Sequence, residues 1–474
     1  MRAGSRVVLA LAALALAGAN EGDEVHVVFC AECKSDMDWK SAGMFHSWHA
    51  SGMRGAITRL LACTHDQLAN YPKEALEMGP TFVHRNYRLE PRVPHDKSGS
   101  YNKAASIMHF VQEVAFPEPY VLYMDADMLI RRPMWPAELG VKRGTVVSEH
   151  VLYLEQGVNH GLVQQFAPNA TGTPAPVGWY HFFHRDDIRK IAPLWLHYCE
   201  RMRTEPELYW AKYGKIPKDI PTGDSFVREG GIPWISEMYG YVIAAAVVGV
   251  DHILTHGVVK YAQWPEDHKG REDFNWDPYI VHNGIACEVK AEGGNYRFHK
   301  GAVGVNPAQA CRVQDERMRY AQRPPPLAKP DGTARPFNEQ LCIWATNTLN
   351  NAFCGLYRAQ CGNPAEECPV EYAEAPSPTC SDAEAACPEW AKKGECTRNS
   401  GWMRTTCALS CGHCAKIPPL DRAPERTFNG TLGHRISGDL GPKADLASAA
   451  AGGPGVEAAA SPGGGDSPAV GAGD

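Results

Sequence analysis

Two hydrophobic periods alternate along residues 25–250, and they predict strands alternating with helices. Residues 38–51 and 102–114 place apolar side chains at helical spacing. Residues 239–250 form an apolar run that is too short to cross a membrane and is predicted to be a buried helix. Mostly apolar runs predict strands, of the kind buried in a parallel sheet, at 25–29, 57–63, 81–84 and 120–124. This alternation favours an α/β fold with a mostly parallel sheet, whose ligands bind at the carboxyl ends of the strands.

The beginning of the chain and its cysteine content predict export. Residues 1–19 join a basic start, an apolar run from 7 to 17 and small residues, which is the pattern of a cleaved signal peptide. The alternative is an uncleaved anchor, and membrane association is expected only in that case. The 16 cysteines fit an oxidising compartment, so we expect the lumen of the endoplasmic reticulum or Golgi, or secretion. Sequons at Asn169 and Asn429 agree with this route.

Charge and composition exclude some functions and divide the chain. A net charge of -7 argues against a nucleic-acid partner, which would need a strong basic field. Residues 24–363 are long enough for one large α/β domain, and the Pro-rich residues 364–379 are predicted to be a linker. Residues 416–474 are rich in Ala, Gly, Pro and Ser and are predicted to be a disordered tail.

A small disulfide knot is predicted at residues 380–414. A segment this short cannot build a sufficient core, so covalent links are the usual solution. A zinc site at residues 411–414 is the alternative. The spacing of the cysteines, with Trp390 and the SCGHC ending, resembles a ShK toxin-like (ShKT) domain. The six cysteines are Cys380, Cys387, Cys396, Cys407, Cys411 and Cys414, and their pairing stays open.

The clearest chemical signal is Asp125-Ala-Asp127, directly after the predicted strand 120–124. Two carboxylates at the exit of a buried strand are costly unless they hold a cation. Carboxylates suit a hard divalent ion, which stabilises the negative charge that grows on a departing nucleoside diphosphate. Nucleotide-sugar transfer needs this chemistry. A phosphatase with an aspartyl nucleophile is the alternative, but Leu129 stands where such enzymes usually have Thr or Val.

Several segments of the chain resemble one known family. These are FCAEC at 29–33, ITRLLACT at 57–64, YMDADMLIR at 123–131, APLWL at 192–196 and WISEMYGY at 234–241. Together they resemble the peptidyl serine α-galactosyltransferases, which are related to the hydroxyproline O-arabinosyltransferases. The resemblance implies a GT-A-type fold, UDP-galactose as donor, Mn²⁺ as cofactor, and retaining transfer to serine in hydroxyproline-rich proteins.

The resemblance also suggests roles for single residues. It supports Asp125, Asp127 and His282 as metal ligands, with His282 in an HNG triplet where the family usually has His-Tyr-Gly. Glu237 and Asp224 are the carboxylates we would test for catalysis, because a retaining transferase can use a carboxylate on the β face of the sugar, either as nucleophile or to stabilise an oxocarbenium-like state. Alternatively, the departing phosphate deprotonates the acceptor, and no protein base is essential. Trp234, Tyr239 and Tyr241 either line the sugar pocket or pack as core. The residues expected to bind the UDP-sugar are Asn102, Lys103, Gly284, Lys300 and Trp234. Of these, Lys103 and Lys300 are expected to neutralise the diphosphate.

Alternatives remain for one motif and for the function. Cys30-Ala-Glu-Cys33 resembles a redox motif, although we favour a structural disulfide for this pair because it ends a predicted strand. Arg59, inside an apolar strand, is expected to meet a carboxylate or UDP. The sequence predicts a metal-dependent galactosyltransferase. Transfer of arabinose to hydroxyproline, or a catalytically silent secreted binding protein that works through the ShKT domain, are the alternatives.

Overall fold

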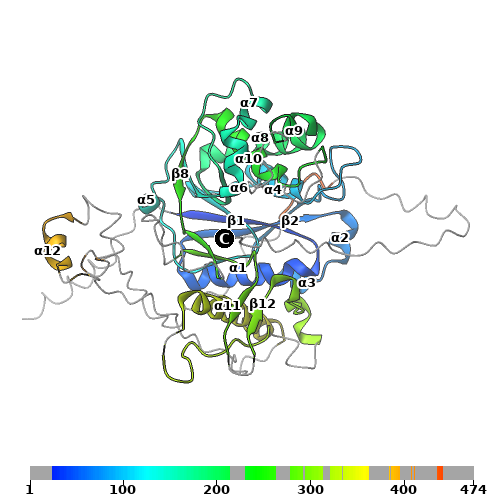
Figure 1. Cartoon of the computed structure of the whole chain (residues 1–474). Helices are drawn as coiled ribbons and strands as arrows, with labels where there is room; N and C mark the ends of the chain where they lie inside the picture. The colour runs from blue at the N-terminus through cyan, green and yellow to red at the C-terminus, as the bar shows by residue number, and fades with distance from the viewer. Residues whose placement is uncertain are drawn as a thin grey trace, which may run out of the picture.

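A central sheet with helices on both faces forms the described part of the protein (Figure 1). The computed structural model describes residues 24–213, 230–262, 278–291, 294–312, 321–333, 335–361, 384, 386–395, 407, 410 and 435–440. The predicted signal peptide, the linker 364–379, Asp224 and Asn429 lie outside the described residues.

The central sheet has the strand order β13-β3-β2-β1-β4-β7-β6-β8. Neighbouring strands are parallel except where β7 pairs with β4 and with β6, so the predicted mostly parallel α/β fold is confirmed. All four predicted strands belong to this sheet. Its strands are β1 (Val25–Glu32), β2 (Gly55–Cys63), β3 (Thr81–Arg85), β4 (Tyr120–Met124), β6 (Thr145–His150), β7 (Val177–His184), β8 (Asp251–Thr255) and β13 (Arg435–Ile436).

Two smaller sheets lie beside the central one. A three-stranded sheet contains β5 (Met128–Ile130), β9 (Val259–Tyr261) and β10 (Ile280–His282), with β10 between the other two. A two-stranded sheet pairs β11 (Cys287–Val289) with β12 (Tyr296–Phe298). The three-stranded sheet matters for function, because β5 begins directly after the Asp125-Ala-Asp127 motif.

Helices α4, α8 and α10 lie on one side of the sheet, and α1 and α11 lie on the other (Figure 1). Among the described residues, none of the helices combines the length and the hydrophobicity that a membrane crossing requires. The helices are α1 (Asp38–Ser51), α2 (His65–Asn70), α3 (Lys73–Leu76), α4 (Ser100–Glu113), α5 (Pro136–Leu139), α6 (Leu152–Asn159), α7 (Leu162–Phe166), α8 (Arg185–Thr204), α9 (Pro206–Tyr213), α10 (Ser236–Val248), α11 (Phe337–Cys361), α12 (Cys387–Lys392) and the 3₁₀ helices η1 (Ser35–Met37), η2 (Lys300–Ala302) and η3 (Pro307–Arg312).

The WISEMYGY segment forms the start of α10, which packs closely on α8. A Cβ atom at Gly240 would lie 2.8 Å from the backbone nitrogen of Cys199, so a glycine is needed where the two helices approach. Tyr239 and Tyr241 are fully buried. The ring of Tyr241 stacks on His181 with centroids 3.6 Å apart. The segment is therefore largely a packing motif, and these two tyrosines belong to the core.

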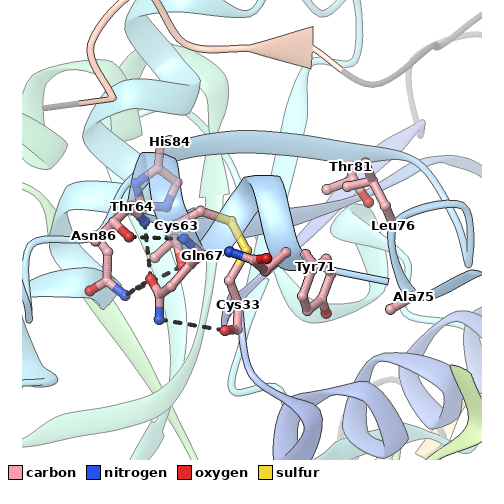
Figure 2. Close-up of a disulfide and its surroundings, with 12 residues drawn as sticks. Cys33, Cys63, Thr64, Gln67, Tyr71, Ala75, Leu76, Thr81, His84 and Asn86 are labelled. Atoms are coloured by element: carbon pink, nitrogen blue, oxygen red, sulfur yellow. Dashed lines mark hydrogen bonds between the residues drawn. A yellow bond between two sulfur atoms is a disulfide. The ribbon is translucent and has the colours of Figure 1, made fainter. Parts of the chain in front are cut away.

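A disulfide joins the ends of β1 and β2, but it is not the one favoured from the sequence. Cys33 bonds to Cys63 (Figure 2), and Cys30 is a free thiol. Residues three apart in a strand point to opposite faces of the sheet, so Cys30 and Cys33 do not bond to each other. Cys30 instead accepts a hydrogen bond from the Ser106 hydroxyl of α4, at 3.1 Å. Further disulfides are Cys287–Cys342, Cys311–Cys361 and, within the predicted knot, Cys387–Cys407.

Polar contacts hold the chain beside this disulfide (Figure 2). Thr64 and Gln67 form a capping box at the start of α2, in which each side chain bonds the other residue's backbone N–H. The Gln67 side-chain oxygen, Oε1, also accepts a hydrogen bond from the Asn86 side-chain amide, at 3.0 Å. Among the described residues, no carboxylate lies within salt-bridge distance of Arg59, and Arg59 does not line the cavity described below. Its buried guanidinium donates to Thr81 and to the carbonyl oxygens of Ala75 and Leu76.

The prediction of a wholly disordered tail is wrong for residues 435–440. Strand β13 pairs in parallel with β3, and the Ser437 N–H donates to the Val83 carbonyl at 2.8 Å. The Ser437 hydroxyl donates to Glu113 at 2.9 Å. Leu440 is only 9% exposed and packs in the cluster that contains Cys33, Cys63 and Val83. The open edge of β3 and this apolar cluster are the partners that composition alone did not show.

Truncation at two positions tests whether this segment stabilises the domain. A chain ending at residue 434 is expected to lose about 2 kcal/mol of unfolding free energy relative to a chain ending at 440, because Leu440 is no longer buried. Urea unfolding of the two chains measures the difference. Equal stability of the two truncated chains would contradict the described pairing.

Candidate functional site

The candidate site lies at the carboxyl ends of β1 and β4, where the strand order of the sheet changes direction. From β1 the chain continues to β2 and β3 on one side, whereas β4 leads to the other side. Ligands of open α/β sheets bind at such a switch point. A cavity of about 220 Å³ is found here, between the ends of these strands, η1, α1 and α4. Its lining residues are Cys30, Ala31, Glu32, Met37, Lys40, Gly99, Asn102, Lys103, Tyr123, Asp125, Ala126 and Asp127.

The structure brings the three predicted metal ligands together. Strand β10 pairs antiparallel with β5 and places His282 opposite Met128. The His282 Nε2 atom then lies 3.2 Å from the Asp127 Oδ1 atom. The Asn283 N–H donates to the Asp127 carbonyl at 2.9 Å and fixes the same junction. One ligand atom from each of Asp125, Asp127 and His282 lies within 4.8 Å of the others.

This group of side chains fits a divalent cation. Two carboxylates and an imidazole are ligands that Mn²⁺ and similar ions accept. The Nδ1 atom of His282 is buried and has no hydrogen-bond partner among the described residues. Neighbouring side chains, rather than a second polar contact, therefore hold the ring. Those neighbours are aromatic: Tyr261 stacks on His282 at 4.8 Å, and Trp179 meets its edge at 5.9 Å.

The two predicted diphosphate lysines lie in the site, but each is paired with carboxylates. The Lys300 ammonium lies 2.9 Å from Asp127. The Lys103 ammonium lies 2.9 Å from Asp125 and 2.7 Å from Glu237. Burial by itself lowers the pKa of Lys103, but the two carboxylates outweigh it and hold that pKa well above its usual value. Lys103 therefore links Asp125, a candidate metal ligand, to Glu237, the candidate catalytic carboxylate.

Asp127 and Glu237 differ in their electrostatic surroundings. Burial disfavours the charge of Asp127, but His282 and Lys300 outweigh it and hold the pKa of that carboxyl well below its usual value. Burial raises the pKa of Glu237, in spite of the opposing effect of Lys103. Glu237 stands in the first turn of α10, where the indole N–H of Trp195 donates to its carbonyl oxygen at 2.6 Å.

Two other predicted residues have different surroundings from those expected. Asn102 lines the cavity, but its side-chain oxygen accepts from the backbone N–H groups of Tyr87 and Arg88, at 2.8 and 3.3 Å. Its side chain thus shapes the loop after β3. Trp234 is 44% exposed and is not among the residues that line the cavity. Asn169 is exposed, as a glycosylated residue must be.

The sequence did not point to Trp179, whose backbone lies in the left-handed region with φ of 67°. Trp179 lies in β7, where the register with β6 shifts between Ser148 and Glu149. A shift of this kind is a β-bulge, which redirects the side chains beside it. The Trp179 indole donates to the Tyr153 hydroxyl at 3.1 Å and packs on Tyr261. No sequence pattern marks this residue, because the bulge depends on pairing between distant strands.

Gly284 supports the candidate metal ligands through its small size. A Cβ atom there would lie 2.4 Å from Cε1 of Tyr261 and 3.1 Å from Nε2 of His282. We expect Gly284→Ala to displace both rings and to weaken Mn²⁺ binding about tenfold, as loss of support around a metal ligand usually does. Titration with Mn²⁺, followed by electron paramagnetic resonance, measures this. Gly355→Ala in α11 is the control, because its Cβ meets nothing within 4 Å; equal affinities of the two variants would refute the steric argument.

The fold and the site describe an α/β protein with a carboxylate and imidazole group at the switch point of its sheet, and its sequence relatives are glycosyltransferases. It is 28% identical to a peptidyl serine alpha-galactosyltransferase of Chlamydomonas reinhardtii, over 83% of this chain and 56% of that protein. It is 32% identical to a protein of the same name from Arabidopsis thaliana, over 58% of this chain and 31% of that protein. The chain thus spans about half of the algal relative and about a third of the plant one.

The chain is also similar to a second group of glycosyltransferases and, near its C-terminal end, to a small domain family. A hydroxyproline O-arabinosyltransferase of Medicago truncatula is 26% identical over 42% of this chain and 50% of that protein. The predicted resemblance to both groups is therefore confirmed. A family model described as ShK domain-like matches residues 379–414. The solved structure of a galactosyltransferase, LgtC, with donor and acceptor sugar analogues aligns with a TM-score of 0.31 and 12% identity, over 54% of this chain and 86% of that one.

Proposed function

We propose that this protein is a GT-A-type, metal-dependent glycosyltransferase that moves galactose from UDP-galactose to serine in hydroxyproline-rich proteins, with retention of configuration. The observation that carries the proposal is the convergence of Asp125, Asp127 and His282 at the end of β4, beside a cavity. The similarity to peptidyl serine alpha-galactosyltransferases supports the sugar and the acceptor. The disulfides support a secretory lumen, the endoplasmic reticulum or Golgi.

Asp125, Asp127 and His282 would hold a divalent cation, with Mn²⁺ as the proposed ion. When bound, such a cation supplies Lewis-acid stabilisation of the departing diphosphate. The protein's own part is to hold both carboxylates in place. Lys300 and Lys103 do this, because each ammonium lies 2.9 Å from one of the two aspartates.

Glu237 is the carboxylate that we propose acts at the anomeric carbon. Its salt bridge to Lys103 ties its position to Asp125 and thus to the end of the donor that departs. A carboxylate on the β face of the sugar either attacks the anomeric carbon or stabilises an oxocarbenium-like state, and both routes lead to retention of configuration. Asp224 remains the second candidate. Gly284, Asn102 and Trp234 are proposed to shape the UDP-sugar site, with Gly284 and Asn102 acting through the packing described above.

A donor screen tests the proposal. Purified protein with Mn²⁺ and a Ser-Pro-rich peptide is incubated with each UDP-sugar, and released UDP and glycosylated peptide are measured. We expect turnover with UDP-galactose and modification of serine. Turnover with UDP-arabinofuranose alone would select arabinose transfer instead. Absence of turnover with every UDP-sugar would overturn the enzyme and favour a binding protein that uses its ShK-like segment.

A further inference from the structure

The cavity at the end of β4 contains a lysine, Lys40, that the proposed function has not yet used. Lys40 belongs to the first turn of α1 and lines the cavity together with Met37 of η1. It lines the same cavity as Asp125 and Asp127, which follow the end of β4. Its side chain is partly buried. Lys40 therefore brings a positive charge into the site from an element that contributes no candidate ligand.

The surroundings of Lys40 differ from those of the two other lysines in the site. The ammonium groups of Lys103 and Lys300 lie 2.7–2.9 Å from carboxylate oxygens. Lys40 donates to the Met37 sulfur at 3.6 Å, and a thioether is a weak acceptor. The Lys40 ammonium also lies 5.7 Å from the centroid of the Trp39 ring. Among the described residues, no salt bridge within 4.0 Å joins Lys40 to a carboxylate. A partly buried ammonium without a counterion is costly, and an anion in the cavity would remove that cost.

The other charges of the cavity favour a bound anion beside Lys40. Glu32, the remaining acid of the lining, is neutralised by Arg88 at 3.3 Å and Lys34 at 3.9 Å. Asp125 and Asp127 are the residues that would hold the cation. Burial lowers the pKa of Lys40, and the nearby charges of Asp127 and Asp36 oppose this shift without cancelling it. With the acids engaged in this way, Lys40 is the positive group that remains for phosphate oxygens among the described residues that line the cavity.

We propose that Lys40 binds the diphosphate of the nucleotide, as a positive group supplied by α1. The inference rests on the proposed function, because that function brings a nucleoside diphosphate into the cavity. It changes the roles expected from the sequence, where Lys103 and Lys300 were assigned to the diphosphate. In the structure, these two lysines hold the carboxylates, and Lys40 is the lysine that is not already paired with one. Lysine acts on phosphate as a point charge, so its position matters more than its exact orientation.

Calorimetric titration with UDP, UMP and uridine in the presence of Mn²⁺ tests this inference. We expect Lys40→Met to weaken UDP binding about tenfold or more, since hydrogen bonds to charged groups are lost, and to leave uridine binding unchanged. Lys40→Arg keeps the charge and is expected to retain most of the affinity. Lys73→Met is the control, because Lys73 lies on the surface in α3 and pairs with Glu77.

The outcomes separate the inference from the proposed function. Equal weakening of uridine and UDP by Lys40→Met would show a structural effect and overturn the assignment of Lys40. UDP binding that is unchanged in Lys40→Met would also overturn it, while leaving the proposed function intact. Failure of the unaltered protein to bind UDP with Mn²⁺ present would overturn both.

Discussion

Replacement of Asp127 by asparagine is expected to reduce metal-dependent release of UDP about a hundredfold or more. The variant keeps the size of the side chain but removes the charge that faces His282 at 3.2 Å and Lys300 at 2.9 Å. A neutral amide at this position binds a divalent cation more weakly, so the charge on the departing diphosphate loses its stabilisation. Release of UDP from UDP-galactose, measured against Mn²⁺ concentration, gives both the rate and the metal affinity. Chelation with EDTA is expected to silence the unaltered protein in the same assay.

Asp187→Asn is the matched control for this variant. Asp187 is also a buried aspartate, but it accepts a hydrogen bond from the Gly144 N–H at 2.6 Å and does not line the cavity. We expect this control to lower stability and to leave the dependence on Mn²⁺ unchanged. Activity of Asp127→Asn close to that of the control would refute the assignment of Asp127 as a metal ligand.

The second large effect is expected at Glu237. Glu237→Gln is expected to lower kcat about a hundredfold or more while changing the affinity for UDP little, because the carboxylate is proposed to act on the sugar during transfer. The variant keeps the volume of the side chain, and Lys103 keeps Asp125 as its partner at 2.9 Å. Steady-state kinetics with UDP-galactose and the peptide, together with titration by UDP, separate the two effects.

Glu339→Gln controls for the loss of a buried ion pair as such. Glu339 is buried in α11 and lies 3.0 Å from Arg335, away from the cavity. We expect this variant to be less stable at an unchanged kcat. If Glu237→Gln and Glu339→Gln lowered kcat equally, Glu237 would be a structural acid and the departing phosphate would remain as the base for the acceptor.

Patterns between neighbours in the chain explain why much of the fold could be predicted. Short windows of sequence contain the apolar runs of β1 to β4 and the helical periodicity of α1 and α4, so these elements could be predicted from neighbouring residues. The position of Asp125 and Asp127 at the end of β4 could also be predicted from neighbouring residues, because a strand buried in the sheet ends where charged residues begin. The disorder predicted for residues 435–440 was wrong because their partner, the β3 edge, is far away in the sequence.

The sequence alone thus determined the alternation of elements, the position of the candidate metal-binding carboxylates after β4, and the family that the chain resembles. The tertiary structure decided which distant groups meet those carboxylates. Lys103 reaches Glu237 across 134 residues, and Lys300 reaches Asp127 across 173. It also paired Cys33 with Cys63 in place of Cys30. The physical reason is that local pattern reflects burial and backbone preference, whereas the charge around a buried group depends on strand pairing and helix packing, which join residues without any fixed spacing.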